Sequence, residues 1–428
     1  MSLMALGLFL GLLLLGVPIV VAMGAAGVAA LLWGGYPLEL LVERLHGGAS
    51  MQALLAVPLF MIMGRVMEAG GMLTRLMDVS LAALGRGRMG VCLACVLASM
   101  LFAGVSGSAA ADVTAVGALF IPAMLRRGMP PARAAALQAA GGSMGIVIPP
   151  SIPMIVYSAV TGVSVGRLFT AGLLPGLLMA VALAAVAWMQ ERRAVAAAGA
   201  VDVVDEPAPA FGPALRRAAL VAPAPVLVVG SILLGMATAT EAAALGLGYV
   251  VLAGLLGTRE LRPAMLPGCF MDAGIAAARV LCIIAAATPL TWILAMDQAP
   301  ARIGVLLADM AGSPLVLLLV INLVLLLAGA ILETTSCLLL FVPLLAPLAR
   351  LAGLAPEQMG VMVVMNLAIG MLTPPMGVCL MLSSAMAGQG MGASSRAALV
   401  HVAALLAVLA LVALWPPLTT WLPSYLFS

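Results

Sequence analysis

Two pairs of adjacent prolines interrupt apolar stretches of this chain, Pro149-Pro150 and Pro374-Pro375. A proline pair removes two backbone donors from a helix and forces the preceding residue out of the helical conformation. Inside a membrane, such irregular backbone persists only where protein buries it or where it lines a polar cavity. A chain of this kind therefore has to fold around two non-helical segments held at membrane depth.

The composition is that of a protein with many membrane-spanning segments. Of the 428 residues, 64% are hydrophobic and 8% are charged, whereas a soluble domain is about half apolar and a quarter charged. The net charge of +3 is too small for nucleic-acid binding, and two histidines exclude a histidine-rich metal site. Cys92 and Cys95 form a lone C-x-x-C motif, which favours small apolar helix residues over a metal or redox site.

The first apolar run, 3–33, has neither a basic start nor a small-residue cleavage pattern at the usual length. We therefore expect it to be retained membrane structure and not a removed signal peptide. It is either one tilted helix or two short helices hinged between Gly16 and Pro18.

The chain consists of two halves that repeat with a constant offset. The second proline pair follows the first by 225 positions, and the same offset relates Gly104 to Gly329 and Pro122 to Pro347. Such self-similarity indicates an internal structural repeat. The long polar segment between the halves predicts a cytoplasmic linker. The expected division is a first repeat at 1–190, a linker at 191–217 and a second repeat at 218–428.

Each half contains a long apolar segment with a polar middle, at 89–125 and 314–350. As a single helix, either would be ~55 Å long, against a hydrocarbon core of ~30 Å. We therefore predict helical hairpins that enter and leave the membrane on the same side, with their tips at membrane depth. The proline pairs predict broken helices at 134–160 and 358–386, and amphipathic connectors are expected at 72–87 and 297–312.

Arginines are distributed unevenly around the two hairpins. Those near the first are Arg75, Arg86, Arg88, Arg126, Arg127 and Arg133, and those near the second are Arg302 and Arg350. Because cytoplasmic loops are enriched in basic residues, the first hairpin is expected to open to the cytoplasm and the second to the opposite side. The predicted fold is an all-α polytopic membrane protein with two inverted-topology repeats, each holding a re-entrant hairpin and a broken helix.

Polar residues within the apolar segments concentrate at the two hairpin tips and the two helix breaks. They are Ser106, Ser108, Asp112 and Thr114; Gly141, Gly142, Ser143, Pro149, Pro150 and Ser151; Glu333, Thr334, Thr335 and Ser336; and Asn366, Thr373, Pro374 and Pro375. Any single serine, threonine or glycine among them can serve only to pack helices. Their concentration at all four places favours binding sites.

The chemistry of these four places suits two kinds of ligand. Unwound helix frees carbonyl oxygens, which together with hydroxyl and amide oxygens suit a small hard cation such as Na⁺. The N-termini of the half-helices attract carboxylates. This combination predicts a secondary transporter for an organic anion. The residues predicted to contact the anion are Ser108, Asp112, Ser151, Asn366 and Thr373.

Three carboxylates lie within apolar sequence, where a charge is costly and often functional. Asp112 either binds a ligand or makes a structural hydrogen bond, and Glu333 either binds an ion or stabilises its hairpin. Glu241, which follows Thr238 closely, is predicted to be the acid in the first turn of a helix.

Four stretches of the sequence match a known family: LFAGVSGSAAADVTAVG at 101–117, AAGGSMGIVIPPSIPMIVYSAVTG at 139–162, GAILETTSCLLLFVP at 329–343 and MNLAIGMLTPPMG at 365–377. With these motifs the chain resembles the large membrane subunit of the tripartite ATP-independent periplasmic (TRAP) transporters, of the C4-dicarboxylate permease type. The resemblance covers nearly the whole chain. One departure is Ala239, where the family often has proline.

This resemblance implies an elevator-type, sodium-coupled importer of a small organic acid in the bacterial inner membrane, and not an enzyme. The implied partners are a small four-helix membrane subunit and a periplasmic substrate-binding protein, and Na⁺ is the implied coupling ion. Connectors 72–87 and 297–312 would join scaffold and moving domain. The implied sodium-binding residues are Ser106, Gly107, Ser108, Gly142 and Pro149 in the first half, and Glu333, Thr334, Thr335, Gly370, Thr373 and Pro374 in the second.

Two other functions are compatible with the motifs. One is a permease that works alone and is driven by protons through Asp112 or Glu333. The other is an intramembrane serine hydrolase, because Gly104-Val105-Ser106-Gly107 resembles the sequence around membrane serine-protease nucleophiles. A hydrolase would need a histidine base near Ser106. The sequence does not identify which organic acid is carried.

Overall fold

The computed structural model describes residues 2–85, 87–198, 209–299, 301–302 and 313–427, and all regular structure in these ranges is helical. Within them, nine helical segments are long and apolar enough to cross a membrane. A tenth span results if α11 (Phe211–Ala218) and α12 (Pro223–Leu233), which meet at a bend of 49°, are counted as one. Helices dominate because a backbone in lipid must satisfy its hydrogen bonds internally. The predicted all-α polytopic fold is confirmed.

The first apolar run forms two short helices, α1 (Ser2–Leu14) and α2 (Ile19–Trp33). Gly16 between them has φ +80°, a conformation that favours glycine, and Pro18 precedes the first residue of α2. Of the two arrangements that the sequence allowed, the hinged pair is the one observed.

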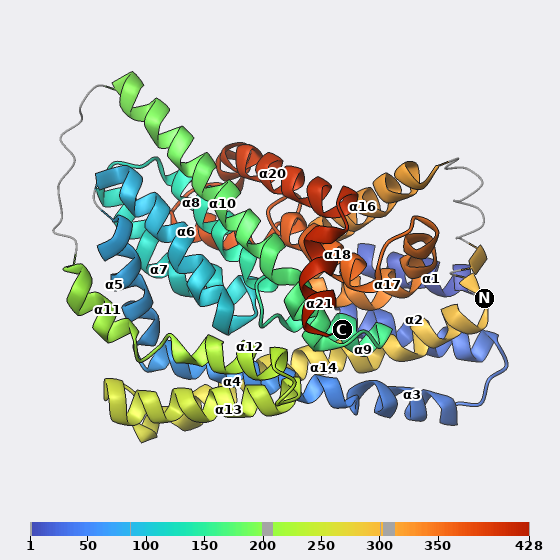
Figure 1. Ribbon diagram of the computed structural model, residues 1–428. Helices are drawn as coiled ribbons and strands as arrows, with labels where there is room; N and C mark the ends of the chain where they lie inside the picture. The colour runs from blue at the N-terminus through green and yellow to red at the C-terminus, as the bar shows by residue number, and fades with distance from the viewer. Residues whose placement is uncertain (1, 86, 199–208, 300, 303–312, 428) are drawn as a thin grey trace.

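One layer of the molecule, which we call the scaffold layer, combines helices from both halves (Figure 1). Its members are α2, α3 (Glu39–Ala49), α4 (Ala56–Ala69) with the preceding 3₁₀ turn η1 (Gln52–Leu55), α12, α13 (Ala239–Leu252) with the π-helical turn η3 (Ala253–Thr258), and α14 (Leu266–Met296) with the 3₁₀ turn η4 (Pro263–Met265). Helix α14 packs along α2, α3 and α4, and α13 packs against α4 and α12. The scaffold layer therefore joins the two halves through direct helix contacts.

A second group of helices forms what we call the hairpin unit. In chain order they are α6 (Gly87–Ser106), α7 (Ala109–Arg126), α8 (Pro131–Ser143), η2 (Met144–Ile146), α9 (Ile152–Thr161), α10 (Val165–Ala198), α16 (Pro314–Ile331), α17 (Thr334–Leu351), α18 (Pro356–Gly370), α19 (Val378–Met386), α20 (Met391–Leu414) and α21 (Pro417–Leu426). Helices α6 and α7 form the first predicted hairpin, and α16 and α17 form the second. Figure 1 shows the two hairpins entering from opposite ends of the molecule, so that their tips approach each other near its middle.

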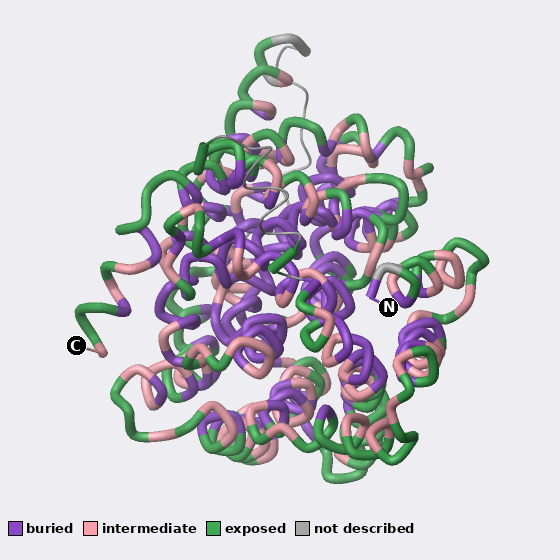
Figure 2. Tube along the Cα trace, turned by 90° about the vertical axis from the view of Figure 1, so that its right-hand side faces the viewer, coloured by how far each residue is buried: buried purple, intermediate pink, exposed green. Residues whose placement is uncertain are grey.

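The broken helices occupy the most buried positions in the hairpin unit. Every residue of 134–147 and of 357–370 is buried, and the tube in Figure 2 is accordingly purple through the centre of the molecule. Small residues permit this packing: a side chain at Gly142 would overlap Val113 of α7. A polar group in these segments is therefore shielded from lipid by surrounding helices.

The start of the predicted polar linker lies within a helix. Helix α10 continues past Glu191 to Ala198, so the first residues of the predicted linker are helical. Glu191 is fully buried and forms ion pairs with Arg88 (2.5 Å) and Arg133 (3.8 Å). The sequence placed this glutamate in the polar linker, and tertiary packing brings two arginines from α6 and α8 to it.

The first amphipathic connector is the helix α5 (Met72–Leu84), which packs on α6 and α11. Most of the second connector, 303–312, lies outside the described residues. At its start, Asp297 accepts hydrogen bonds from the backbone N–H (3.0 Å) and hydroxyl (2.6 Å) of Ser2.

Candidate functional site

The tip of the first hairpin is a two-residue break between α6 and α7. Gly107 has φ +62°, and a Cβ atom there would lie 2.8 Å from the carbonyl oxygen of Pro150, so only glycine fits. Its own carbonyl accepts a hydrogen bond from the backbone N–H of Ile152 (3.3 Å). The tip is therefore joined directly to the first broken helix.

Asp112 lies one turn into α7 and is fully buried. One of its carboxylate oxygens accepts a hydrogen bond from the hydroxyl of Ser106, whose oxygen also accepts from the backbone N–H of Ser108 (3.2 Å). The other oxygen, Oδ2, has no hydrogen-bond partner among the described residues. It faces the 3₁₀ turn of the broken helix, where a side chain at Gly145 would overlap it. The hairpin tip thus directs a free, buried carboxylate oxygen at the broken segment.

The first broken helix is non-helical from Val147 to Ser151, as the proline pair predicts. Ser151 begins α9: its hydroxyl accepts from the backbone N–H of Met154 (3.3 Å) and donates to the carbonyl of Ile146 (2.5 Å). The hydroxyl of Ser151 therefore already has two partners within the break. Pro149 and Pro150 are buried behind it, and the peptide bond between them is cis.

The tip of the second hairpin has a different polar arrangement. Glu333 is the N-cap of α17, and its carboxylate accepts hydrogen bonds from the backbone N–H groups of Thr335 (2.9 Å) and Ser336 (3.2 Å). The hydroxyl of Thr335 donates to the other carboxylate oxygen (3.0 Å). Glu333 therefore stabilises its hairpin as an N-cap, because a side-chain acceptor satisfies the free N–H groups at a helix start. Ion binding by Glu333 stays a prediction.

The second broken helix is held against its hairpin by backbone contacts. A Cβ atom at Gly370 would lie 2.5 Å from the carbonyl carbon of Gly329, and the backbone N–H of Met376 donates to the carbonyl of Ala330 (3.2 Å). The hydroxyl of Thr373 donates to the carbonyl of Gly370 (2.9 Å). Pro374 and Pro375 are exposed, whereas the proline pair of the first half is buried.

Asn366 is fully buried in α18, one turn before the break. Its amide donates to the side-chain oxygen of Asn322 (2.8 Å) and to the carbonyl of Met362 (2.8 Å). Asn322 was not among the predicted site residues, although it is the one polar side chain in the leucine-rich helix α16. A polar residue in such a helix was itself the signal of an interhelical contact.

Two adjoining cavities lie between the hairpin tips and the scaffold layer. The first, of about 210 Å³, is lined by both tips, and we call it the tip cavity. The second, of about 270 Å³, lies between α4, α14 and the first hairpin, and we call it the side cavity. Met61, Ser108 and Ala110 line both.

The predicted site residues divide between these cavities and the packing behind them. Those that line the tip cavity are Gly107, Ser108, Glu333, Thr334 and Thr335, and Ser106 and Ser108 line the side cavity. Those that line neither are Asp112, Gly142, Pro149, Ser151, Asn366, Gly370, Thr373 and Pro374. Of the five residues predicted to contact the anion, only Ser108 therefore faces the open space in this conformation. The others lie at the breaks, behind the tips.

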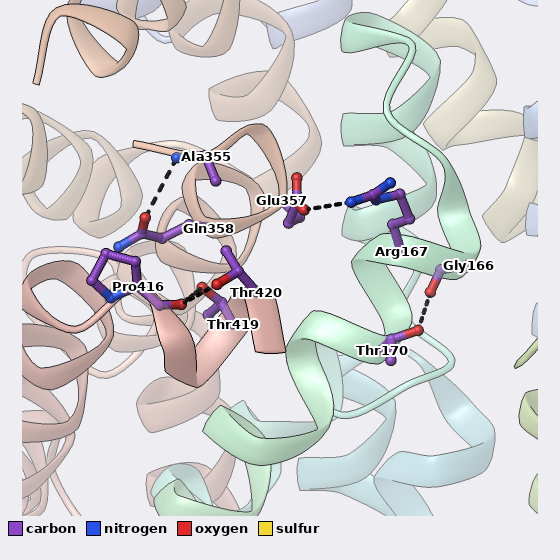
Figure 3. Close-up of polar contacts among 9 residues, drawn as sticks. All are labelled: Gly166, Arg167, Thr170, Ala355, Glu357, Gln358, Pro416, Thr419 and Thr420. Atoms are coloured by element: carbon purple, nitrogen blue, oxygen red, sulfur yellow. Dashed lines mark hydrogen bonds and ion pairs between the residues drawn. The ribbon is translucent and has the colours of Figure 1, made fainter. Parts of the chain in front are cut away.

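The two broken helices are also linked to each other. The hydroxyl of Tyr157 on α9 donates to the carbonyl of Pro356 at the start of α18 (2.9 Å). Nearby, Arg167 of α10 pairs with Glu357 at 3.2 Å, as Figure 3 shows.

Away from the site, Thr238 and Glu241 form a reciprocal cap at the start of α13, which confirms the predicted role of Glu241.

The arrangement therefore combines two opposed hairpins, two broken helices in a shielded core and a cavity between their tips. Such discontinuous helices around a central cavity define a membrane transport protein. The described hydrogen bonds of Ser106 are to Asp112 and Ser108, so this serine is part of a carboxylate network.

Comparisons with known proteins specify the family. Residues 6–418 match the model of the family described as "Tripartite ATP-independent periplasmic transporter, DctM component". The C4-dicarboxylate TRAP transporter large permease protein DctM of Pseudomonas aeruginosa is 37% identical over 407 residues, which cover 95% of this chain and 94% of that protein. The 2,3-diketo-L-gulonate TRAP transporter large permease protein YiaN of Escherichia coli is 33% identical, with 87% of each chain covered.

A solved structure supports the fold alone. The YdaH transporter of Alcanivorax borkumensis superposes with a TM-score of 0.61 at 18% identity, and the match covers 88% of this chain and 87% of that one. The chain belongs to the DctM family: it is the large permease subunit of a TRAP transporter, a multi-pass protein of the inner membrane and not an enzyme.

Proposed function

We propose that this subunit takes up a small organic acid with Na⁺ as the coupling ion. The observation that carries the proposal is the free oxygen of Asp112, buried at the junction of the first hairpin and the first broken helix. A buried charge of this kind is stable only with a partner. A cation held by this oxygen and by neutral oxygens of the tip would supply that partner.

The residues around Asp112 fit Na⁺ better than a transition metal. The hydroxyl of Ser106 and the backbone carbonyl of Ser108 lie within the same network, and hard oxygen donors suit hard cations. Among the described residues, no group of three or more histidine, cysteine, aspartate or glutamate side chains is arranged to hold a metal ion. Na⁺ when bound would neutralise the carboxylate and fix the tip against the break.

The organic acid is expected in the tip cavity, where the second hairpin presents Thr334 and the first presents Ser108. Relatives are named for C4-dicarboxylate and for 2,3-diketo-L-gulonate, which supports a carboxylate as the substrate class. Membership of a tripartite family supports delivery by a periplasmic substrate-binding protein and assembly with a small four-helix membrane subunit. The separation into scaffold layer and hairpin unit supports an elevator movement of the latter.

The first test is a melting curve of the purified protein in rising NaCl, with choline chloride as the matched salt. A ligand at a hundred times its dissociation constant stabilises the folded state by ~2.7 kcal/mol, which is easily resolved. We expect a rise in melting temperature with sodium only. The Asp112→Asn variant should lose this rise, whereas Asp272→Asn, an exposed acid on α14, should keep it.

Proton coupling through Asp112 is the second candidate, and the same free oxygen favours it. It predicts equal melting curves in the two salts and a pH-dependent stability that Asp112→Asn removes. Uptake measurements test the predicted sodium ligands further. Ser106→Ala removes the hydroxyl beside Asp112, and Thr373→Ala removes the hydroxyl at the second break; each should raise the sodium concentration needed for half-maximal uptake. Unchanged sodium dependence in both variants would contradict the proposed cation sites.

A further inference from the structure

The side cavity has one charged wall, which neither hairpin supplies. Four residues of α4 line it at the spacing of a single helix face: Met61, Gly64, Arg65 and Glu68. A Cβ atom at Gly64 would lie 3.8 Å from the Cα atom of Ser106, so this face of the scaffold layer lies directly against the hairpin tip. A ligand held at the tip therefore has α4 as its neighbour.

Arg65 is the only positively charged residue among the described residues that line either cavity. Its Nη1 atom lies 3.1 Å from a carboxylate oxygen of Glu68, and the two side chains are 50% and 45% exposed. An ion pair this exposed is weak, because water screens the charges and both side chains lose freedom. The guanidinium can therefore exchange this carboxylate for another.

The side cavity and the tip cavity adjoin each other, so a ligand at the tip lies close to α4. Met61 and Ser108 line both spaces, and Arg65 lies one helical turn beyond Met61. One turn of four residues advances about 6 Å along the helix axis. The carboxylate of Glu333 in the tip cavity would repel an anion, so among the described lining residues Arg65 is the group that can attract an anionic ligand by charge.

We propose that Arg65 is a carboxylate-binding residue of the scaffold layer, which exchanges Glu68 for the carboxylate of the transported acid. This inference rests on the proposed function and adds a specificity residue to it. The planar guanidinium binds a carboxylate through two parallel hydrogen bonds, a geometry that an uncharged analogue cannot reproduce. Glu68 neutralises Arg65 when the cavity is empty, and a ligand must compete with it.

The test uses a cysteine reporter, Thr114→Cys, because Thr114 lines the side cavity opposite α4. The background carries Cys282→Ser, which removes the exposed native cysteine. The rates of labelling by an anionic methanethiosulfonate (the ethylsulfonate) and a cationic one (the ethyltrimethylammonium) are compared in the purified protein. Neither rate depends on sodium coupling or on transport, so the result is independent of the proposed function.

If Arg65 sets the charge of the cavity, Arg65→Gln lowers the anionic-to-cationic rate ratio by about tenfold, the effect of removing one charge–charge contact of ~1.4 kcal/mol. Glu68→Gln raises the ratio. The matched control is Arg44→Gln, which removes another arginine of the scaffold layer beside a glutamate, outside both cavities. An unchanged ratio in Arg65→Gln overturns the proposal.

Binding itself is tested by protection of the reporter from the anionic reagent. Succinate, N-acetylneuraminate and gluconate are the probes, each compared with its uncharged amide. We expect at least one acid to slow labelling more than its amide does, and Arg65→Gln to remove the difference while Arg65→Lys retains part of it. If no acid protects more than its amide, or if Arg65→Gln retains the difference, Arg65 does not bind carboxylates and the inference fails.

Discussion

Replacing Gly370 with alanine should force the second hairpin away from the broken helix that it contacts. A Cβ atom at this position would lie 2.5 Å from the carbonyl carbon of Gly329 and 2.8 Å from its Cα and carbonyl oxygen. These are backbone atoms of α16, so no side-chain rotation can relieve the overlap. The two helices must separate, and the hydrogen bond from Met376 to Ala330 lies next to the contact.

The expected loss of stability follows from two opposing effects. Inserting a methyl group into a well-packed contact costs about 1–3 kcal/mol, and a backbone clash belongs at the upper end of this range. Alanine regains at most about 1 kcal/mol over glycine in a helix. The net expectation is a loss of about 1–2 kcal/mol in the free energy of unfolding.

The matched control is Gly274→Ala in α14, where no heavy atom lies within 4 Å of the modified position. This variant should be neutral or stabilised by up to about 1 kcal/mol, since only the helix propensity changes. Both variants are compared with the wild type by reversible unfolding in mixed detergent and SDS. If Gly370→Ala is as stable as Gly274→Ala, the close approach of α16 and α18 is not part of the folded protein.

Three further perturbations test other contacts. Glu333→Gln weakens the cap of α17 and should lower the free energy of unfolding by about 1 kcal/mol, and an unchanged melting temperature would contradict the cap. Tyr157→Phe leaves the carbonyl of Pro356 without its donor and should lower the free energy of unfolding by about 1 kcal/mol. Equal SDS-unfolding midpoints for this variant and the wild type would argue against the hydrogen bond between α9 and α18. The hydrogen bonds from Ser2 lower the pKa of Asp297 to about 2. The stabilisation that they give the folded state is therefore present above the unfolded pKa of about 3.9. It is lost as the pH falls through the folded pKa. Acid melting curves of Ser2→Ala should show less of this loss.

Much of the fold is predictable because it depends on local physics. Proline pairs break helices wherever they occur, and an apolar segment too long for one span must fold back on itself. The polar middles at Ser106 and Glu333 therefore located both hairpin tips before any packing was known. The ion pairs of Glu191 were not predictable for the opposite reason, since its arginine partners come from segments distant in the sequence.

The site was predictable as a set of places but not as a set of contacts. Sequence alone determined that hydroxyls, glycines and carboxylates would gather at two tips and two breaks. Only the tertiary structure decided that Glu333 caps its own helix, that Asp112 faces the break with a free oxygen, and that Arg65 joins the cavity from the scaffold layer. Helix breaks and tips are fixed by the residues themselves, whereas the partner of a polar side chain depends on which distant helix packs beside it.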